Sequence, residues 1–196
     1  MDAEQNLREG VREAYSAAAR HPGGEHPFPV GREFAESLGY PPSLLDDLPE
    51  LAVGTFAGVS NVSVLATLAH GANVLDLGCG GGLDSLIAGQ HVGPRGRVVG
   101  IDFSAAMLVR ASGAVRAVGA RNILLARVAA ERLPLPDKSI DVALVNGMFN
   151  LNPARTKIFG ELARVVVSGG VVYSAELILK APLLQAVRAE EASWFA

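Results

Sequence analysis

The chain has a single cysteine, few aromatic residues and no surplus of one charge: its 196 residues hold 17 Lys and Arg against 20 Asp and Glu. One cysteine excludes an intramolecular disulfide and leaves a cysteine-based metal site without enough ligands, so we expect no bound metal. The charges are interspersed without a basic stripe, which argues against a nucleic-acid partner. Residues 1–5 lack the features of a signal peptide, and the most apolar stretch, 162–184, is broken by charged residues and glycines. We therefore expect a cytoplasmic protein without a membrane span.

The first 70 residues differ in pattern from the rest. Apolar residues at helical spacing predict a helix over 2–20, which the proline- and glycine-rich stretch 21–29 cannot continue. Short helices are expected around 32–38 and 43–47. We interpret residues 1–70 as a helical and looped N-terminal cap segment and residues 71–196 as the core. Because 196 residues suffice for one buried core, the two parts are expected to form one compact unit.

From residue 71 onward, apolar runs alternate with helix-like stretches. Strands that alternate with helices imply right-handed crossovers and a parallel sheet covered on both faces. The fold class predicted is therefore α/β, with a doubly wound, mostly parallel, Rossmann-like sheet. The strands are expected at 73–77, 97–101, 122–127, 140–145 and 170–176, and the helices at 83–91, 104–118 and 154–166.

The most informative motif is the run Val-Leu-Asp-Leu-Gly-Cys-Gly-Gly-Gly at 74–82, an apolar strand that enters an acidic, glycine-rich loop. Alternating glycines, Gly78 and Gly80 among them, allow tight turning beneath an extended ligand. Asp102 ends the next strand, where a carboxylate can bind ribose hydroxyls. Leu83 stands where a dinucleotide motif requires glycine, so S-adenosylmethionine is favoured over NAD. Asp76 is expected to hold the amino group of a methionine moiety, directly or through water.

Two further segments are candidates for the base of a nucleoside. Phe103 and Met107 follow Asp102 and either line an adenine pocket or belong to the core. Ser104 is expected to cap the helix at 104–118 while Asp102 remains free to bind the ribose. The loop at 129–137, which includes Ala130 and Glu131, either offers backbone amides to a purine edge or is a surface connection.

Asn146 and Cys79 complete the candidate site. Asn146 ends the fourth strand, where a methyl acceptor would approach. Cys79 lies between glycines with no basic partner nearby in sequence, so we interpret it as a small residue tolerated in a tight loop rather than as a nucleophile.

Together these residues resemble a class I S-adenosylmethionine-dependent methyltransferase of the arsenite methyltransferase branch. The resemblance implies the cofactor and methyl transfer, and it places the first helix over the cofactor with Tyr15 near it. It does not extend to the arsenic-binding cysteines, because Gly147 stands where the branch has one. The segments that carry the resemblance are 11–15, 74–84, 93–96, 133–137 and 145–151.

Two other departures from the family bear on the expectations. Ala129 replaces the usual acidic residue of the adenine loop. The chain also lacks the antiparallel strands that normally close the sheet, since 186–196 is helix-like; either a homodimer covers the edge or the chain is truncated.

The function expected is methyl transfer from S-adenosylmethionine to a small-molecule acceptor other than arsenite bound through cysteines. Two alternatives stay open. One is a non-catalytic accessory protein that binds S-adenosylmethionine or S-adenosylhomocysteine, and the other is an NAD-dependent oxidoreductase.

Overall fold

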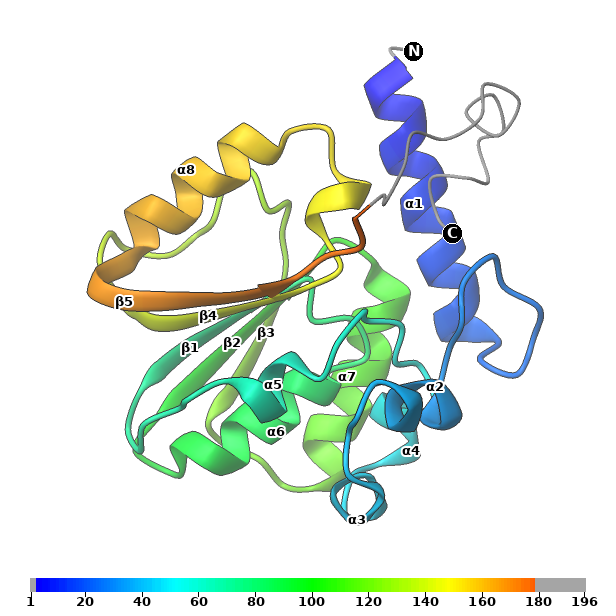
Figure 1. The fold of residues 1–196 in the computed structure, drawn as a ribbon, viewed down its shortest axis with the longest axis horizontal. Coiled ribbons are helices and arrows are strands. Elements are labelled where there is room, and N and C mark those ends of the chain that lie inside the picture. The colour runs from blue at the N-terminus through cyan, green and yellow to red at the C-terminus, as the bar shows by residue number, and fades with distance from the viewer. Residues whose placement is uncertain (1–2, 179–196) are drawn as a thin grey trace.

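Five parallel strands form the centre of the fold, in the spatial order β3-β2-β1-β4-β5 (Figure 1). The computed structural model describes residues 3–178. The sheet confirms the predicted doubly wound α/β class, because all four neighbouring pairs are parallel. The strands are β1 (Asn73–Leu77), β2 (Arg97–Asp102), β3 (Ile123–Arg127), β4 (Ile140–Asn146) and β5 (Val166–Ala175).

The strand order reverses between β1 and β4. The chain builds outward from β1 through β2 to β3 and then returns to add β4 on the other side of β1. Leu77, at the end of β1, is level with Ile101 of β2 and with Val145 of β4. Ligands of such sheets bind beyond the carboxyl ends of the strands at the point of reversal. The glycine-rich loop after Leu77 therefore begins at the expected place.

Helices cover the two faces of the sheet unequally. Helices α5 (Val62–Leu65), α6 (Leu83–Val92) and α7 (Ala105–Ala117) lie below the sheet in Figure 1, and α8 (Arg155–Val165) lies above it. Successive side chains of a strand point to opposite faces. Val74 accordingly packs with residues of α6, whereas Leu75 and Leu77 pack with residues of α8. The alternation decides which residues of β1 can face which layer.

The N-terminal segment packs onto the same core as the sheet. Its helices are α1 (Ala3–Arg20), α2 (Arg32–Ser37), α3 (Pro42–Asp46) and α4 (Glu50–Val53), followed by α5. Tyr40, Leu45 and Val53 are buried in one hydrophobic cluster with Val74 and Leu86 of the α/β part. Helix α1 packs on α7 through Ala18, Ala19 and Met107. The boundary at residue 70 stays a prediction.

The structure differs from the sequence-based expectations at the short elements and at β5. Helices α4 and α5 and the 3-10 turn Phe149–Leu151 were not predicted. Strand β5 begins at Val166, directly after α8, and not at 170, because Ser168, Gly169 and Gly170 are typical of a turn but here form an irregularity within the strand. The helix expected at 186–196 lies outside the described residues. Within 3–178, the sheet contains no antiparallel strand.

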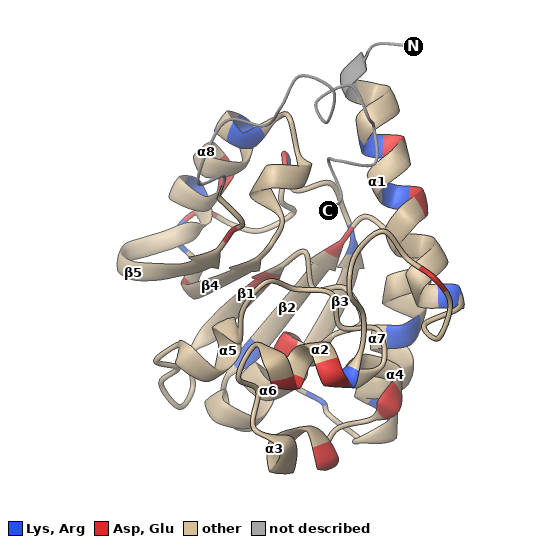
Figure 2. Cartoon of the chain, turned by 45° about the vertical axis from the view of Figure 1, so that its right-hand side comes forward, with Lys and Arg blue, Asp and Glu red and all other residues tan. Residues whose placement is uncertain are grey.

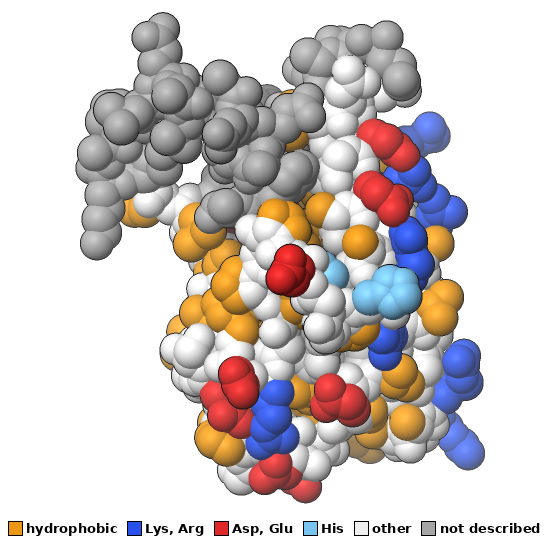
Figure 3. All heavy atoms as spheres, turned by 90° about the vertical axis from the view of Figure 1, so that its right-hand side faces the viewer, with side chains coloured by type: hydrophobic (Ala, Val, Ile, Leu, Met, Phe, Trp, Pro, Cys, Tyr) orange, Lys and Arg blue, Asp and Glu red, His pale blue; other side chains and the backbone are white. Residues whose placement is uncertain are grey.

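Acidic and basic side chains are mixed along α1, as Figures 2 and 3 show. Arg12 is paired with Glu9 and Arg20 with Glu13, on the exposed side of that helix. None of the helices in the described ranges is long and apolar enough to cross a membrane. Strand β5 lies at one edge of the described sheet, with Val171 and Val172 exposed; a homodimer that covers this edge stays a prediction.

Candidate functional site

The glycine-rich loop turns sharply after β1. Gly78, Gly80 and Gly82 have φ values of +80°, +52° and +90°, a region that other residues rarely adopt. The N–H groups of Gly78 and Cys79 both donate to the carbonyl of Ile101, at 2.8 and 3.0 Å. These bonds hold the loop against the end of β2. The predicted tight turning at the alternating glycines is confirmed.

Asp102 is fixed at the end of β2 by the backbone around it. One of its carboxylate oxygens accepts the N–H of Gly80 at 2.9 Å, and the other accepts the N–H of Ser104 at 2.7 Å. Burial raises the pKa of Asp102, and these N–H groups oppose the shift. Ser104 caps α7 by accepting the N–H of Met107, as predicted. Each oxygen of Asp102 retains acceptor capacity for a ligand.

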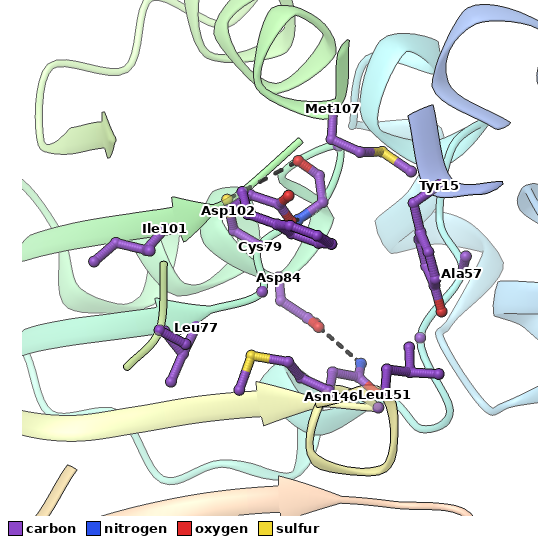
Figure 4. A pocket seen from close by; sticks show the side chains of 18 of the residues that line it. Tyr15, Ala57, Leu77, Cys79, Asp84, Ile101, Asp102, Met107, Asn146 and Leu151 are labelled. Carbon is purple, nitrogen blue, oxygen red and sulfur yellow. Dashed lines mark hydrogen bonds between the residues drawn. The ribbon is translucent and has the colours of Figure 1, made fainter. Parts of the chain in front are cut away.

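A cavity of about 1040 Å³, its open mouth included, lies beyond the carboxyl ends of β1, β2 and β4. Its walls come from α1, the segment 52–58, the glycine-rich loop, the end of β2, and the loops 128–131 and 146–152. Figure 4 shows Asp102 and Met107 on one side of the space and Asn146 and Leu151 on the other. Ten of the eleven predicted site residues line this cavity: Tyr15, Gly78, Cys79, Gly80, Asp102, Phe103, Met107, Ala130, Glu131 and Asn146.

Asp76 is the exception, and its placement corrects the expectation of direct contact with the ligand. Its side chain points to the face of the sheet that α6 covers, where it accepts the hydroxyl of Ser85 at 2.5 Å. Burial raises its pKa to about 8, and the nearby charge of Asp84 adds to the shift. Asp76 therefore supports the loop from beneath and does not line the cavity.

Cys79 and Met107 are both buried and both line the cavity. Burial raises the pKa of the Cys79 thiol well above its usual range, and the carboxylates of Asp76 and Asp102 raise it further. A thiol held protonated is a poor nucleophile and a poor ligand for a thiophilic ion. Met107 is also part of the cluster that joins α1 to α7, so it belongs to the core as well as lining the cavity, and its contact with adenine stays a prediction.

Tyr15 extends from α1 over the cavity. Its ring stacks on Phe28 with centroids 4.4 Å apart, and its hydroxyl points toward the side of Ala57 and Leu151 (Figure 4). Burial raises the pKa of Tyr15, as do the charges of Asp102 and Glu176. The hydroxyl therefore stays protonated and is available as a donor.

Asn146 and Asp84 connect the N-terminal segment to the sheet. The Asn146 side-chain oxygen accepts the N–H groups of Val59 and Ser60, at 2.8 and 3.1 Å. Its NH₂ group donates to the Ser60 carbonyl at 2.7 Å and to Asp84 at 2.9 Å, the bond drawn in Figure 4. Asp84 also accepts the hydroxyls of Tyr40 and Ser63. Four bonds use the whole hydrogen-bonding capacity of the Asn146 amide.

Glu131 joins three walls of the cavity. Its carboxylate lies 3.3 Å from the guanidinium of Arg8 on α1 and accepts the side-chain NH₂ of Asn152 at 3.0 Å. The loop that carries Glu131 is thereby held between α1 and the loop after β4. Glu131 and Ala130 both line the cavity, and the predicted contact of their backbone with a purine stays a prediction.

Sequence reasoning missed several residues of the site. Asp84 was within the segment 74–84 that carries the family resemblance, and its position in the first turn of a helix was the one available signal. Nothing in the sequence pattern brings Arg8 or Gly58 to the cavity, because both depend on how the N-terminal segment folds back. The sequence pattern also gave no signal for Glu176, whose carboxylate accepts the N–H groups of Met148, Phe149 and Asn150.

The charge of the cavity distinguishes between nucleoside ligands. Asp84, Asp102 and Glu131 line it, and Arg8, paired with Glu131, is the cation among the lining residues. Three carboxylates against one guanidinium favour a ligand with a positive centre, such as a sulfonium, over a pyrophosphate. Fold and site together define an α/β protein that fits S-adenosylmethionine better than a dinucleotide.

Comparisons with known proteins agree. The family described as methyltransferase domain matches residues 68–195. An arsenite methyltransferase of Halobacterium salinarum is 35% identical over 150 residues, which are 76% of this chain and 38% of the relative. A demethylmenaquinone methyltransferase of Listeria welshimeri is 35% identical over 107 residues, 54% of this chain and 45% of the relative. The chain therefore spans less than half the length of these curated relatives.

Among solved structures, CrArsM, an arsenic(III) S-adenosylmethionine methyltransferase from Chlamydomonas reinhardtii, has a TM-score of 0.63 at 27% identity, over 84% of this chain and 56% of that protein. The chain belongs to the methyltransferase domain family and, within it, to the class I S-adenosylmethionine-dependent methyltransferases. S-adenosylmethionine is the cofactor of this class.

Proposed function

We propose that this chain transfers a methyl group from S-adenosylmethionine to a small-molecule acceptor, which is not arsenite bound through cysteine thiolates. The observation that carries the proposal is the single cavity that extends from Asp102 on β2 to Asn146 on β4. Because the same cavity reaches both strand ends, an acceptor beside Asn146 would lie next to a cofactor held at Asp102.

The residues at the β2 end fit the cofactor. Asp102 would accept the ribose hydroxyls, the positive-φ glycines let the backbone approach, and the amides around Ala130 would face the base. When bound, the cofactor supplies an activated methyl group. In the transfer, the bond between that carbon and sulfur breaks with its electron pair on sulfur, and an acceptor lone pair forms the new bond.

The chain's own contribution is alignment and exclusion of water. Helix α1 and the segment 52–58 cover the cavity, and holding two reactants in line can supply a large part of a rate acceleration. No described residue is placed as an essential base: Asp84 accepts three hydrogen bonds, and Glu131 is paired with Arg8. The acceptor must therefore bring its own nucleophilic lone pair.

Arsenite is disfavoured because the sequence contains one cysteine. Cys79 is a buried residue of the glycine-rich loop with a raised thiol pKa, so it is held as a thiol and has no second cysteine to pair with it as an arsenic ligand. The similarity to proteins named arsenite methyltransferase covers less than half of the Halobacterium salinarum relative and says nothing of this chain's acceptor.

Calorimetric titration with S-adenosylhomocysteine and with NADH tests the cofactor. We expect saturable binding of the first and none of the second; tight NADH binding alone would overturn the proposal. Turnover is then followed by mass spectrometry of S-adenosylhomocysteine release with a panel of amines, thiols, phenols, quinols and arsenite with glutathione. Cofactor binding without turnover on any acceptor would favour the accessory protein, whose supporting observation is the absence of a placed base.

A further inference from the structure

The acceptor side of the cavity follows from the topology, given the proposed function on which this inference rests. A ligand anchored at Asp102 on β2 extends across β1 toward β4, because β1 lies between them. The acceptor then meets the methyl group beside the segment 146–152. We call this segment, together with Gly58 and the facing side of α1, the β4 end of the cavity.

Within the β4 end, the segment 147–152 has no backbone N–H to offer a ligand. The N–H of Gly147 donates to the carbonyl of Ala175 at 2.9 Å. Those of Met148, Phe149 and Asn150 donate to the carboxylate of Glu176 at 3.0, 2.8 and 3.2 Å. The next two, at 151 and 152, donate to the carbonyls three residues earlier. Six consecutive donors are thus used within the fold.

The polar side chains there are used as well. All four hydrogen-bonding positions of the Asn146 amide are occupied by Ser60, Val59 and Asp84. Asn152 donates to Glu131 and accepts the N–H of Ala154 at 2.8 Å. What remains toward the cavity is apolar surface from Val11, Ala57, Met148 and Leu151. A ligand gains contact area here but few hydrogen bonds.

Charge adds a second restriction. Asp84 and Glu131 line this end, and the guanidinium of Arg8 is already paired with Glu131. An anionic acceptor would meet carboxylates and lose its hydration without gaining an unpaired cation among the lining residues, which is costly. In the described part of the chain, the Tyr15 hydroxyl has no hydrogen-bond partner. One neutral donor suits a hydroxyl or carbonyl oxygen of a neutral molecule.

We propose that the β4 end of the cavity binds a neutral, largely apolar acceptor and rejects anionic ones. Recognition is by shape and apolar contact, and Glu176 and Asn146 act as positioning residues that close the wall by using its donors.

A matched pair of fluorescent probes tests this. N-phenyl-1-naphthylamine and 1-anilinonaphthalene-8-sulfonate share one ring system and differ by a sulfonate. Each is titrated against protein saturated with S-adenosylhomocysteine, which fills the cofactor end, and against protein without it. We expect the neutral probe to bind at least about tenfold more tightly, a difference of about 1.4 kcal/mol. Equal binding of the two, or a preference for the sulfonate, would overturn the inference.

Variants locate the probe. Leu151→Glu places a carboxylate in the apolar wall and should weaken the neutral probe about tenfold; Met148→Glu serves if that variant does not fold. Val109→Glu is the matched control, because Val109 is 71% exposed on α7 and does not line the cavity. A probe affinity unchanged by both wall variants would place the probe elsewhere and refute the apolar subsite. Absence of S-adenosylhomocysteine binding would instead refute the proposed cofactor, so the two failures are distinguishable.

Discussion

At the β2 end of the cavity, each carboxylate oxygen of Asp102 accepts one backbone N–H and keeps capacity for a ligand. At the β4 end, the amide of Asn146 makes four hydrogen bonds and keeps none. Asp102 ends β2 and Asn146 ends β4, the two strands that flank β1, so the topology brings both residues to the same edge of the sheet. The difference arises from what packs against each residue. The glycine-rich loop lies against Asp102, and the segment 58–60 lies against Asn146. Position at a strand end therefore does not by itself make a residue available to a ligand.

Removing the β2 anchor should have the largest effect. Asp102→Ala deletes the ribose acceptor and the bond that fixes Gly80, so we expect the affinity for S-adenosylhomocysteine to fall about 100-fold, which corresponds to roughly one hydrogen bond to a charged group. Calorimetric titration measures it, and Asp47→Ala, at an exposed carboxylate on the N-terminal segment, is the control. An affinity unchanged by the substitution would remove Asp102 from the site.

Adding a side chain at Gly58, in the β4 end of the cavity, should destabilise the fold. A Cβ atom on Gly58 would lie 2.5 Å from the Nδ2 atom of Asn146, which cannot move without breaking its four bonds. Gly58→Ala is expected to lower the free energy of unfolding by about 2 kcal/mol in urea titration. Gly160→Ala is the control, since nothing lies within 4 Å of its added methyl group. The double variant Gly58→Ala with Asn146→Ala tests the cause. If its loss in the free energy of unfolding equals the sum of the losses of the two single variants, the clash between residues 58 and 146 is not the reason for the destabilisation.

Between the two ends, Asp76 should make stability depend on pH. Its folded pKa of about 8 exceeds the roughly 4 of an unfolded aspartate, so the folded state holds a proton that the unfolded state releases between these values. The free energy of unfolding therefore falls as pH rises through this window. Relative to wild type, Asp76→Asn should gain about 1.4 kcal/mol between pH 6 and 7. Parallel stability curves for the two proteins would contradict this.

Freeing the N–H donors at the β4 end of the cavity should have the smallest effect on stability. Glu176→Gln leaves one oxygen in place of two for three N–H donors, and we expect a loss of about 1 kcal/mol in urea titration. The freed donors should also raise the affinity of the anionic naphthalene probe about threefold. Glu33→Gln, an exposed carboxylate on α2, is the control. If the variant prefers the neutral probe over the anionic one as strongly as wild type does, Glu176 does not make the N–H groups of 148–150 unavailable to ligands.

Much of the sheet and of the cofactor end was predictable because both depend on local pattern. The apolar run of β1, the alternating glycines and Asp102 at the end of β2 are each specified within a few residues of the chain. The start of β5 was misplaced because Ser168 to Gly170 favour a turn locally, whereas the residues on either side of them, Val166 and Val171, both pair with β4. Direct contact of Asp76 with the ligand was expected because the glycine motif does not show which face of the sheet its side chain takes.

The sequence by itself determined the α/β class, the cofactor and the absence of a thiolate pair, since periodicity, glycine spacing and a residue count are properties of the chain. Tertiary structure alone decided which polar groups remain free. Asn146 meets Ser60, and Glu176 meets the N–H groups of 148–150, only after distant segments pack together. Hydrogen-bonding capacity is finite, and folding decides whether the protein or a ligand uses it.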